Sequence, residues 1–159
     1  VERIGRTADY PFSYALQRVL DGDYAGALIW GFAIDPDDTA VGQLTRSLPV
    51  VALDHKVGHS DTDLVRFDHE RAGYELASHL IKQGCRRIGI TGMLDTLETT
   101  IARIQGVMIA CFENGLQPNP EDFQFISTSG DTSAKVGGLH NLLRQGNRPD
   151  GMVLSLIHI

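Results

Sequence analysis

The 159-residue chain lacks several features that mark specialised classes of protein. No apolar run approaches the ~20 residues that span a bilayer, so the sequence predicts no integral membrane protein. Its two cysteines, Cys85 and Cys111, form neither a C-x-x-C pair nor a zinc spacing, which favours a reduced, cytosolic chain. Lys and Arg number only 14 against 20 Asp and Glu, for a net charge of −6. This balance argues against a nucleic-acid surface in these residues.

Sequence signatures of enzymes are also missing. There is no G-x-S-x-G elbow, no G-x-G-x-x-G and no Walker-type loop, and no nucleophile–base pair can be named. The pair Asp95 and Glu98 has the spacing of a capping box at a helix start, which accounts for both carboxylates. The stretch 129–133 resembles an anion-binding turn, but a plain helix cap explains it equally well. The sequence therefore predicts a protein that is not an enzyme and needs no cofactor.

One loop of the chain carries several potential metal ligands. His55, His59, Asp61 and Asp63 are all potential ligands, yet they follow none of the spacings that hold a metal on a rigid element. A flexible loop is a poor preorganised cage, so a solvated loop is the favoured interpretation and no metal is expected.

Five segments of the chain show the 3.6-residue apolar period of amphipathic helices. Each ends at a residue that commonly stops a helix, either a glycine or a proline. The predicted helices are Phe12 to Leu20, Val41 to Leu48, Ala72 to Ile81, Asp95 or Thr96 to Phe112, and Ser133 to Leu143. Hydrophobic residues make up 42% of the chain and charged residues 21%, which is typical of a globular protein.

Short apolar runs lie between these helices and predict six strands. They are Ala27 to Trp30, Val50 to Leu53, Leu64 to Phe67, Ile88 to Thr91, Phe123 to Ile126 and Met152 to Leu154. Continuous apolar runs suit strands that helices cover on both faces, and the alternation of the two elements predicts an α/β fold with parallel sheets. The polar loop 55–63 contains no helix, and a boundary between two lobes near residues 64–70 would explain the gap.

Ligands of open parallel sheets bind beyond the carboxyl ends of the strands. The residues that follow the predicted strands include aromatics, carboxylates and hydroxyls, namely Trp30, Asp54, His55, Phe67, Asp68, residues 92–100 and residues 127–131. This mixture suits a small hydroxylated or planar ligand. Ordinary loop residues at strand ends explain the same positions, and spacing alone does not decide between the two.

A longer pattern is far more specific. The segments LPVVALD (48–54), VRFDHERAG (65–73), HLIKQGCRRIGITG (79–92) and ARIQG (102–106) follow one another in this order. Together they resemble the effector-binding domain of LacI-family transcriptional repressors, which share a fold with periplasmic sugar-binding proteins. The resemblance covers most of residues 15–154. It departs from the family at Cys85, where His is usual, and at Ala25, where Asp usually precedes the strand.

The resemblance implies a two-lobed periplasmic-binding-protein-like fold with parallel sheets flanked by helices. We expect residues 1–64 to belong to the N-terminal lobe and residues 65–155 to the C-terminal lobe, both partial. The last apolar residues break from the family pattern, so residues 156–159 are interpreted as a non-native or truncated tail. The chain is accordingly expected to be a fragment that is incomplete at both ends.

The resemblance also implies effector-binding residues in the cleft between the lobes. Arg103 matches the arginine that grips effector oxygens, and Asp54 matches an acid that contacts sugar hydroxyls. Thr99 matches a hydroxyl position of the same site. The remaining expected site residues are Phe67 at the first crossover, Trp30 at a cleft position, and Thr132, which stands where many members have an aromatic.

The function implied is that of the effector-sensing domain of a ligand-responsive transcriptional repressor, which binds a small sugar-like metabolite. Operator DNA would be bound through a headpiece absent from this chain, and the intact protein is expected to be a cytoplasmic homodimer with no membrane partner. Two alternatives stay open at this point: a sugar-binding protein of an ABC transporter, and an enzyme of Rossmann type, which the missing motifs disfavour.

Overall fold

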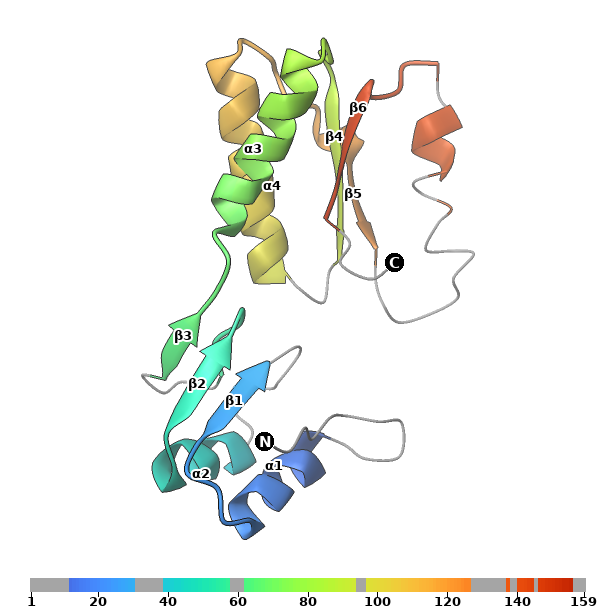
Figure 1. Cartoon of the computed structure of the whole chain (residues 1–159). Coiled ribbons are helices and arrows are strands. Elements are labelled where there is room, and N and C mark those ends of the chain that lie inside the picture. Colours follow the sequence, from blue (N-terminus) through green and yellow to red (C-terminus); the bar gives the residue numbers. More distant parts are fainter. Residues whose placement is uncertain are drawn as a thin grey trace. The chain divides into compact units, whose positions relative to one another are not determined.

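The computed structural model describes residues 12–30, 39–57, 62–93, 97–126, 137, 140–144 and 146–155. Helices and strands alternate along most of this length (Figure 1). The elements are α1 (Phe12–Asp21), β1 (Ala27–Trp30), α2 (Thr39–Ser47), β2 (Val50–Leu53), β3 (Asp63–Val65), α3 (His69–Lys82), β4 (Ile88–Met93), α4 (Leu97–Glu113), the 3₁₀ turn η2 (Pro120–Asp122), β5 (Phe123–Ile126) and β6 (Gly151–Leu154). Four predicted helices are confirmed. The fifth falls largely outside the described residues, although 140–144 are helical.

The strands form two sheets in which every neighbouring pair is parallel. One sheet has the order β1-β2-β3 and the other the order β5-β4-β6. The predicted α/β fold with parallel sheets flanked by helices is therefore confirmed. The third strand differs from its prediction because it ends at Val65, so Arg66 and Phe67 follow the strand instead of belonging to it.

The loop after β2 does not itself mark a division of the chain. It joins β2 to β3, and these two strands are neighbours in the same sheet, with Leu53 opposite Val65. The chain divides into two compact units two residues later, between Phe67 and Asp68. Each unit contains one of the two sheets and a core of its own.

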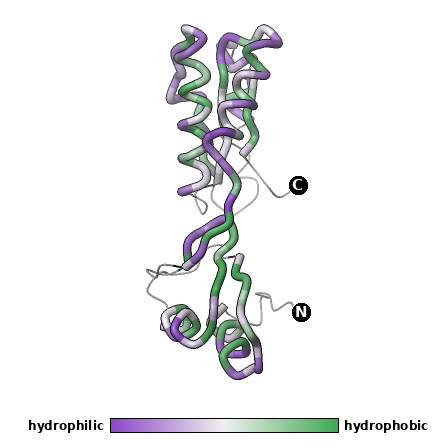
Figure 2. Tube along the Cα trace, turned by 60° about the vertical axis from the view of Figure 1, so that its left-hand side comes forward, coloured by the Kyte–Doolittle hydropathy of each residue, from purple (hydrophilic) through white to green (hydrophobic). Residues whose placement is uncertain are grey.

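The first unit packs α1 and α2 against its sheet. Their inward residues Leu16, Val41 and Leu44 meet Ile29 and Ala52 of the strands, and all of them are buried. Side chains alternate across a strand, which is why Leu28 and Trp30, on either side of Ile29, remain exposed. Figure 2 shows the apolar strands of this unit and the amphipathic helices beside them.

The second unit places α3 and α4 side by side against its sheet (Figure 1). Its core joins Ala77 and Ile81 of α3, Val107 and Cys111 of α4, and Ile90 of β4. Desolvation raises the pKa of the Cys111 thiol, so this buried cysteine stays protonated and packs as an apolar residue. Among the described residues, no helix combines the length and the apolar character needed to cross a membrane.

Helix α3 begins at His69, three residues before the predicted Ala72, and the predicted stop at Gly84 is confirmed. The Asp68 carboxylate accepts a hydrogen bond from the backbone N–H of Arg71 at 2.8 Å, which caps the first turn. At the other end, Gly84 adopts a φ of +101°, a left-handed conformation that glycine reaches without a side-chain clash. The helix therefore starts at the first residues of the second unit, and the chain changes direction at Gly84 before it enters β4.

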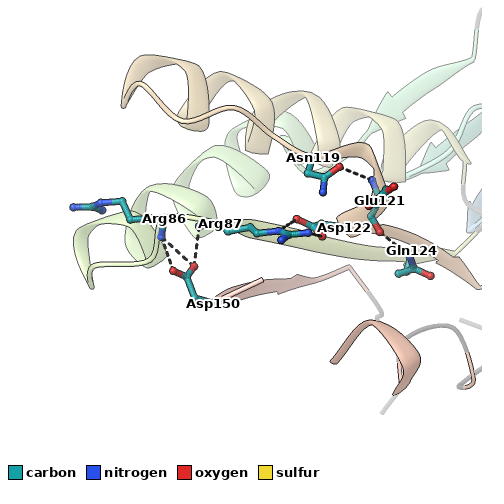
Figure 3. A network of polar contacts seen from close by, with 7 residues as sticks. All are labelled: Arg86, Arg87, Asn119, Glu121, Asp122, Gln124 and Asp150. Atoms are coloured by element: carbon teal, nitrogen blue, oxygen red, sulfur yellow. Dashed lines mark hydrogen bonds and ion pairs between the residues drawn. The ribbon is translucent and has the colours of Figure 1, made fainter. Parts of the chain in front are cut away.

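A polar network lies at the amino edge of the second sheet (Figure 3). Arg87, Asp122 and Asp150 each directly precede a strand, and parallel strands start at the same edge. Arg87 donates to both carboxylate oxygens of Asp122, with Nη2 at 2.7 Å from Oδ1, and the Asp122 side chain is fully buried. The hydrogen bond to Asp122 raises the pKa of the Arg87 guanidinium above its ordinary value. This bidentate pair therefore ties β4 to the start of β5.

Asp150 ties β6 to β4 at the same edge. Its carboxylate accepts the backbone N–H of Arg86 at 2.9 and 3.0 Å and that of Arg87 at 2.9 Å. Burial pushes the pKa of this carboxyl up, but the backbone hydrogen bonds from Arg86 and Arg87 outweigh it, and the net pKa is lowered. The ionised form is therefore the one that holds the two strands together.

The separate cores predict separate responses to core truncation. Leu44→Ala and Ile90→Ala each remove a buried side chain and should each cost about 2–5 kcal/mol of unfolding free energy. The single tryptophan, Trp30, belongs to the first unit and reports its unfolding by fluorescence, whereas circular dichroism reports both units. In urea titrations Leu44→Ala should shift the fluorescence transition and Ile90→Ala should leave it in place. A fluorescence shift of equal size in both variants would contradict two independent cores.

Asp150 predicts a pH dependence of stability. Because its pKa in the folded state lies below the ordinary value of 3.8, its contribution is present above that value and is lost as the pH falls through the folded-state pKa. The Asp150→Asn variant should therefore lose less unfolding free energy than wild type between about pH 6 and pH 2. Urea titrations across this range measure the two slopes, and parallel slopes would contradict the prediction.

Candidate functional site

The first unit presents an aromatic and a carboxylate at the carboxyl edge of its sheet. Trp30 is the last residue of β1 and lies opposite Leu53, the last residue of β2, so Asp54 emerges beside it. The Trp30 side chain is 57% exposed, which is unusual for the largest apolar residue and leaves its ring open to a partner. The parallel register places these two predicted site residues at the same edge of the sheet.

The backbone at Asp54 has a conformation that few residue types tolerate. Its φ is +68°, in the left-handed region where Asp and Asn are enriched. Its N–H donates to the Val65 carbonyl at 2.8 Å, so the ladder between β2 and β3 continues past the last strand residue. The carboxylate lies 3.6 Å from Nε2 of His55, and only 12% of its side chain is exposed. Asp54 is therefore an anchored acceptor at the sheet edge.

Phe67 is the last residue of the first unit and, at 78%, has the most exposed large apolar side chain among the residues that the structure describes. It follows β3 by two residues on the carboxyl side, the same edge from which Trp30 and Asp54 emerge. An exposed aromatic of this kind has a large apolar area that can be covered by a ligand or by other protein.

The second unit carries Arg103 and Thr99 on α4. They are four residues apart and so lie one above the other on the same side of the helix. Arg103 is half-buried, and its Nη1 donates to the Ser155 hydroxyl at 2.7 Å and to the Ser155 carbonyl at 3.4 Å. Ser155 directly follows β6, so the guanidinium lies at the carboxyl edge of this sheet. Thr99, in the first turn of α4, is buried.

Two glycines determine how closely α4 approaches α3. A Cβ added to Gly106 would overlap the backbone carbonyl of Glu70, and one added to Gly73 would overlap the backbone carbonyl of Arg103. The two helices therefore touch backbone to backbone where the Arg103 side chain leaves α4. The Arg-x-x-Gly spacing of the sequence has a physical meaning here: Gly106 permits the contact that fixes the position of Arg103.

The first turn of α4 packs closely on the sheet because residue 92 of β4 is a glycine. A Cβ at Gly92 of β4 would overlap the Cγ2 methyl of Thr100. Thr100 is fully buried, so the first turn of α4 packs directly over the carboxyl end of β4. The helix N-terminus is thus brought to the edge at which ligands of such sheets bind.

The six predicted site residues fall into three groups. Trp30, Asp54 and Phe67 belong to the first unit, and Thr99 and Arg103 belong to the second. Thr132 lies outside the described residues. The sequence did not single out Ser155, which the structure pairs with Arg103. A hydroxyl directly after an apolar strand was the available signal, since such a position lies at the ligand edge of a parallel sheet.

The described residues contain no group of three or more His, Cys, Asp or Glu side chains that could hold a metal ion. Of the four loop residues considered from the sequence, His59 and Asp61 lie outside the described residues. His55 instead contacts the Asp54 carboxylate.

Similarity to known proteins agrees with this geometry. A family model described as periplasmic binding proteins and sugar binding domain of the LacI family matches residues 15–155, nearly the whole chain. The chain belongs to this family. The predicted resemblance is thereby confirmed, and with it the two-lobed periplasmic-binding-protein-like fold class.

Two curated relatives are transcriptional regulators by name, and neither is an enzyme. The HTH-type transcriptional repressor PurR of Aliivibrio salmonicida is 34% identical over 103 residues, which cover 60% of this chain and 31% of the relative. The HTH-type transcriptional regulator Rv3575c of Mycobacterium tuberculosis is 29% identical over 136 residues, 70% of this chain and 38% of the relative. The chain thus spans about a third of the length of these relatives.

Solved structures share the fold at lower identity. A transcription regulator from Lactobacillus plantarum superposes with a TM-score of 0.72 at 23% identity, covering 89% of this chain and 52% of that one. A sugar-binding LacI-family regulator from Escherichia coli, solved with phosphate, gives 0.67 at 22% identity and covers 90% and 51%. At these identities the likeness shows the fold alone.

The glycine contact between α3 and α4 predicts opposite effects for two matched substitutions. Gly106→Ala should destabilise the chain by about 1–3 kcal/mol, because its methyl group overlaps a backbone carbonyl that cannot rotate away. Gly42→Ala in α2 is the control: its Cβ would lie 3.5 Å from the nearest atom, the Arg46 guanidinium, and it should stabilise by about 0.5–1 kcal/mol. Urea titration measures both changes. Equal effects in the two helices would show that the contact does not constrain α4.

Proposed function

We propose that this chain is the effector-sensing part of a ligand-responsive transcriptional regulator and that its effector is a small sugar-like metabolite. The observation that carries the proposal is Arg103, held by Ser155 at the carboxyl edge of a parallel sheet in a domain of this family. A half-buried guanidinium at a ligand edge is suited to hydroxyl and carboxylate oxygens, to which it offers a planar fork of donors.

The other proposed contacts supply complementary chemistry. The Asp54 carboxylate accepts hydrogen bonds from vicinal hydroxyls, and its fixed backbone limits the entropy lost on binding. Trp30 and Phe67 offer exposed ring faces that cover the apolar face of a sugar ring. The hydroxyls of Thr99 and Thr132 add donors and acceptors. Carboxylate, guanidinium and aromatic groups together favour a polyhydroxylated ring over a purely apolar ligand.

The proposed regulatory step is a shift between conformational states of the intact regulator. An effector that binds one of these states more tightly shifts the population toward it. In the intact protein this shift would change the affinity of a DNA-binding headpiece for its operator, by reciprocal coupling. The net charge of −6 in this chain is consistent with operator contacts made elsewhere.

The intact protein is further proposed to act as a homodimer in the cytoplasm. A dimer matches the two-fold symmetry of operators that two headpieces read together. Both curated relatives are named as helix-turn-helix regulators, which supports this assignment. The family description also names periplasmic binding proteins, so a sugar-binding component of an ABC transporter is the second candidate.

The central prediction concerns Arg103. The protein expressed from its complete coding sequence is titrated with D-ribose, D-glucose and D-galactose by isothermal titration calorimetry. Arg103→Ala should weaken binding of the tightest-binding of these sugars by about 2–5 kcal/mol. The sugar oxygen that the guanidinium contacts would then be buried without its charged hydrogen-bond donor. Circular dichroism confirms that the variant remains folded.

Arg71→Ala is the matched control for this experiment. Arg71 lies on α3 and pairs with Glu75 at 2.7 Å in an exposed ion pair, so its removal should leave sugar affinity unchanged. Unchanged affinity in folded Arg103→Ala would remove Arg103 from the site, and failure of all three sugars to bind would exclude a sugar-like effector of this class. Operator binding that does not respond to the bound sugar would favour the transporter component.

A further inference from the structure

The backbone turns sharply at the residue that follows β2. The N–H of His55 donates to the carbonyl of Leu53 at 2.8 Å, and Asp54 between them has a φ of +68°. A hydrogen bond that closes over a single residue with positive φ defines a classic γ-turn, which is rare and strained. We infer that this turn positions the Asp54 carboxylate for the effector and that the fold holds the turn at a cost in stability. The positioning rests on the proposed function, but the strain does not.

The other left-handed positions of the described residues are occupied by glycine. Gly84 and Gly115 have φ values of +101° and +69°, and each lies two residues after the end of a helix. Glycine reaches this region without the clash between Cβ and a carbonyl oxygen that other residues meet. Aspartate tolerates a positive φ better than most residues but does not escape this clash. Glycine at position 54 would form the same turn more easily, and what Asp54 adds to the turn is its carboxylate.

The surrounding structure holds the turn from two sides. The N–H of Asp54 donates to the Val65 carbonyl at 2.8 Å, so the neighbouring strand β3 fixes the central residue of the turn. Three residues further along the chain, Val57 is fully buried in the core of the first unit. Strained conformations persist only where the surroundings determine them in this way, and they are concentrated at ligand-binding and active sites. The sheet and the core therefore together impose the conformation of Asp54.

The turn sets the direction of the carboxylate. Because Val65 fixes the peptide N–H of Asp54, the φ angle decides the direction in which the side chain leaves the backbone. At the φ of a parallel strand, about −120°, the side chain would lie on the same side of the sheet as Ala52, the side that α1 and α2 cover. A φ of +68° turns the Cα–Cβ bond by about half a revolution around the N–Cα bond. The carboxylate lies 3.6 Å from Nε2 of His55, and 12% of its side chain is exposed.

The first test measures the strain and needs no ligand. Asp54→Gly and Asp54→Ala both remove the carboxylate with every contact that it makes, but only glycine reaches a positive φ freely. Urea titration of the protein expressed from its complete coding sequence gives the folding equilibrium constant of each variant at equal protein concentration. This constant should be about fivefold to thirtyfold larger for Asp54→Gly than for Asp54→Ala.

Asp23 is the matched control for this comparison. It is an exposed aspartate of the same unit, and its φ is not positive. Asp23→Ala should have a folding constant about twofold to fivefold larger than Asp23→Gly, because glycine loses more backbone freedom on folding. The reversal of the order between the two positions is the signature of strain at Asp54. A folding constant of Asp54→Ala that equals or exceeds that of Asp54→Gly would overturn the inference.

The second test breaks the turn and keeps the carboxylate. His55→Pro removes the N–H that closes the turn and drives Asp54 toward a negative φ. It should weaken binding of the tightest-binding of D-ribose, D-glucose and D-galactose about tenfold to a hundredfold, the range for losing one hydrogen bond to a charged group. His55→Ala is the control: it removes the imidazole with all its contacts but keeps the N–H, and it should bind nearly as tightly as wild type. Circular dichroism checks that both variants are folded.

The Asp54→Ala background shows whether the turn acts through the carboxylate. In this background His55→Pro should have no further effect on affinity. An equal loss with and without the carboxylate, or an equal loss from His55→Ala, would overturn the positioning role while the proposed function stands. If none of the three sugars binds, the positioning role fails together with the proposed function, and the order of glycine and alanine at position 54 alone decides the strain.

Discussion

The backbone contact between α3 and α4 is the constraint on which the second unit depends. Gly73 and Gly106 let the two helices approach until carbonyls of one meet α-carbons of the other. This close contact between the two helices fixes the position of α4 over the sheet. It therefore also fixes the backbone position from which the Arg103 side chain extends. Helix α3 starts directly after the division between the units, with Asp68 as its cap. The first helix of the second unit is thus in backbone contact with the helix that carries Arg103, the residue that we propose binds the ligand.

The two edges of the second sheet have different chemistry. At the amino edge, Arg87 pairs with the buried Asp122, and Asp150 binds the backbone of Arg86 and Arg87. At the carboxyl edge, the described polar groups include the Ser155 hydroxyl and the Arg103 guanidinium, and the helix α4 begins there. Parallel strands make this separation possible because all their starts lie together and all their ends lie together.

Periodicity and stop signals predicted the elements well, because each depends on neighbouring residues. Helices α1 to α4 and the bounds of β1, β2 and β5 agree with the sequence, and Gly84 ends α3 as expected. The apolar run predicts a strand that continues to Phe67, but the ladder ends with the hydrogen bond between Asp54 and Val65. The pairing of Arg103 with Ser155 was not predictable, since it depends on the order of the strands in the sheet and not on local sequence.

The Arg87–Asp122 ion pair and the Asp150 carboxylate, which link the strands, both lie at the amino edge of the sheet. Substitutions at the carboxyl edge, where we propose that the effector binds, leave the Arg87–Asp122 pair and the Asp150 contacts intact. A duplicated gene can therefore acquire a new ligand specificity without first gaining stability to tolerate the change. In such a scaffold, recognition diversifies at one end of the sheet while the other end preserves the fold.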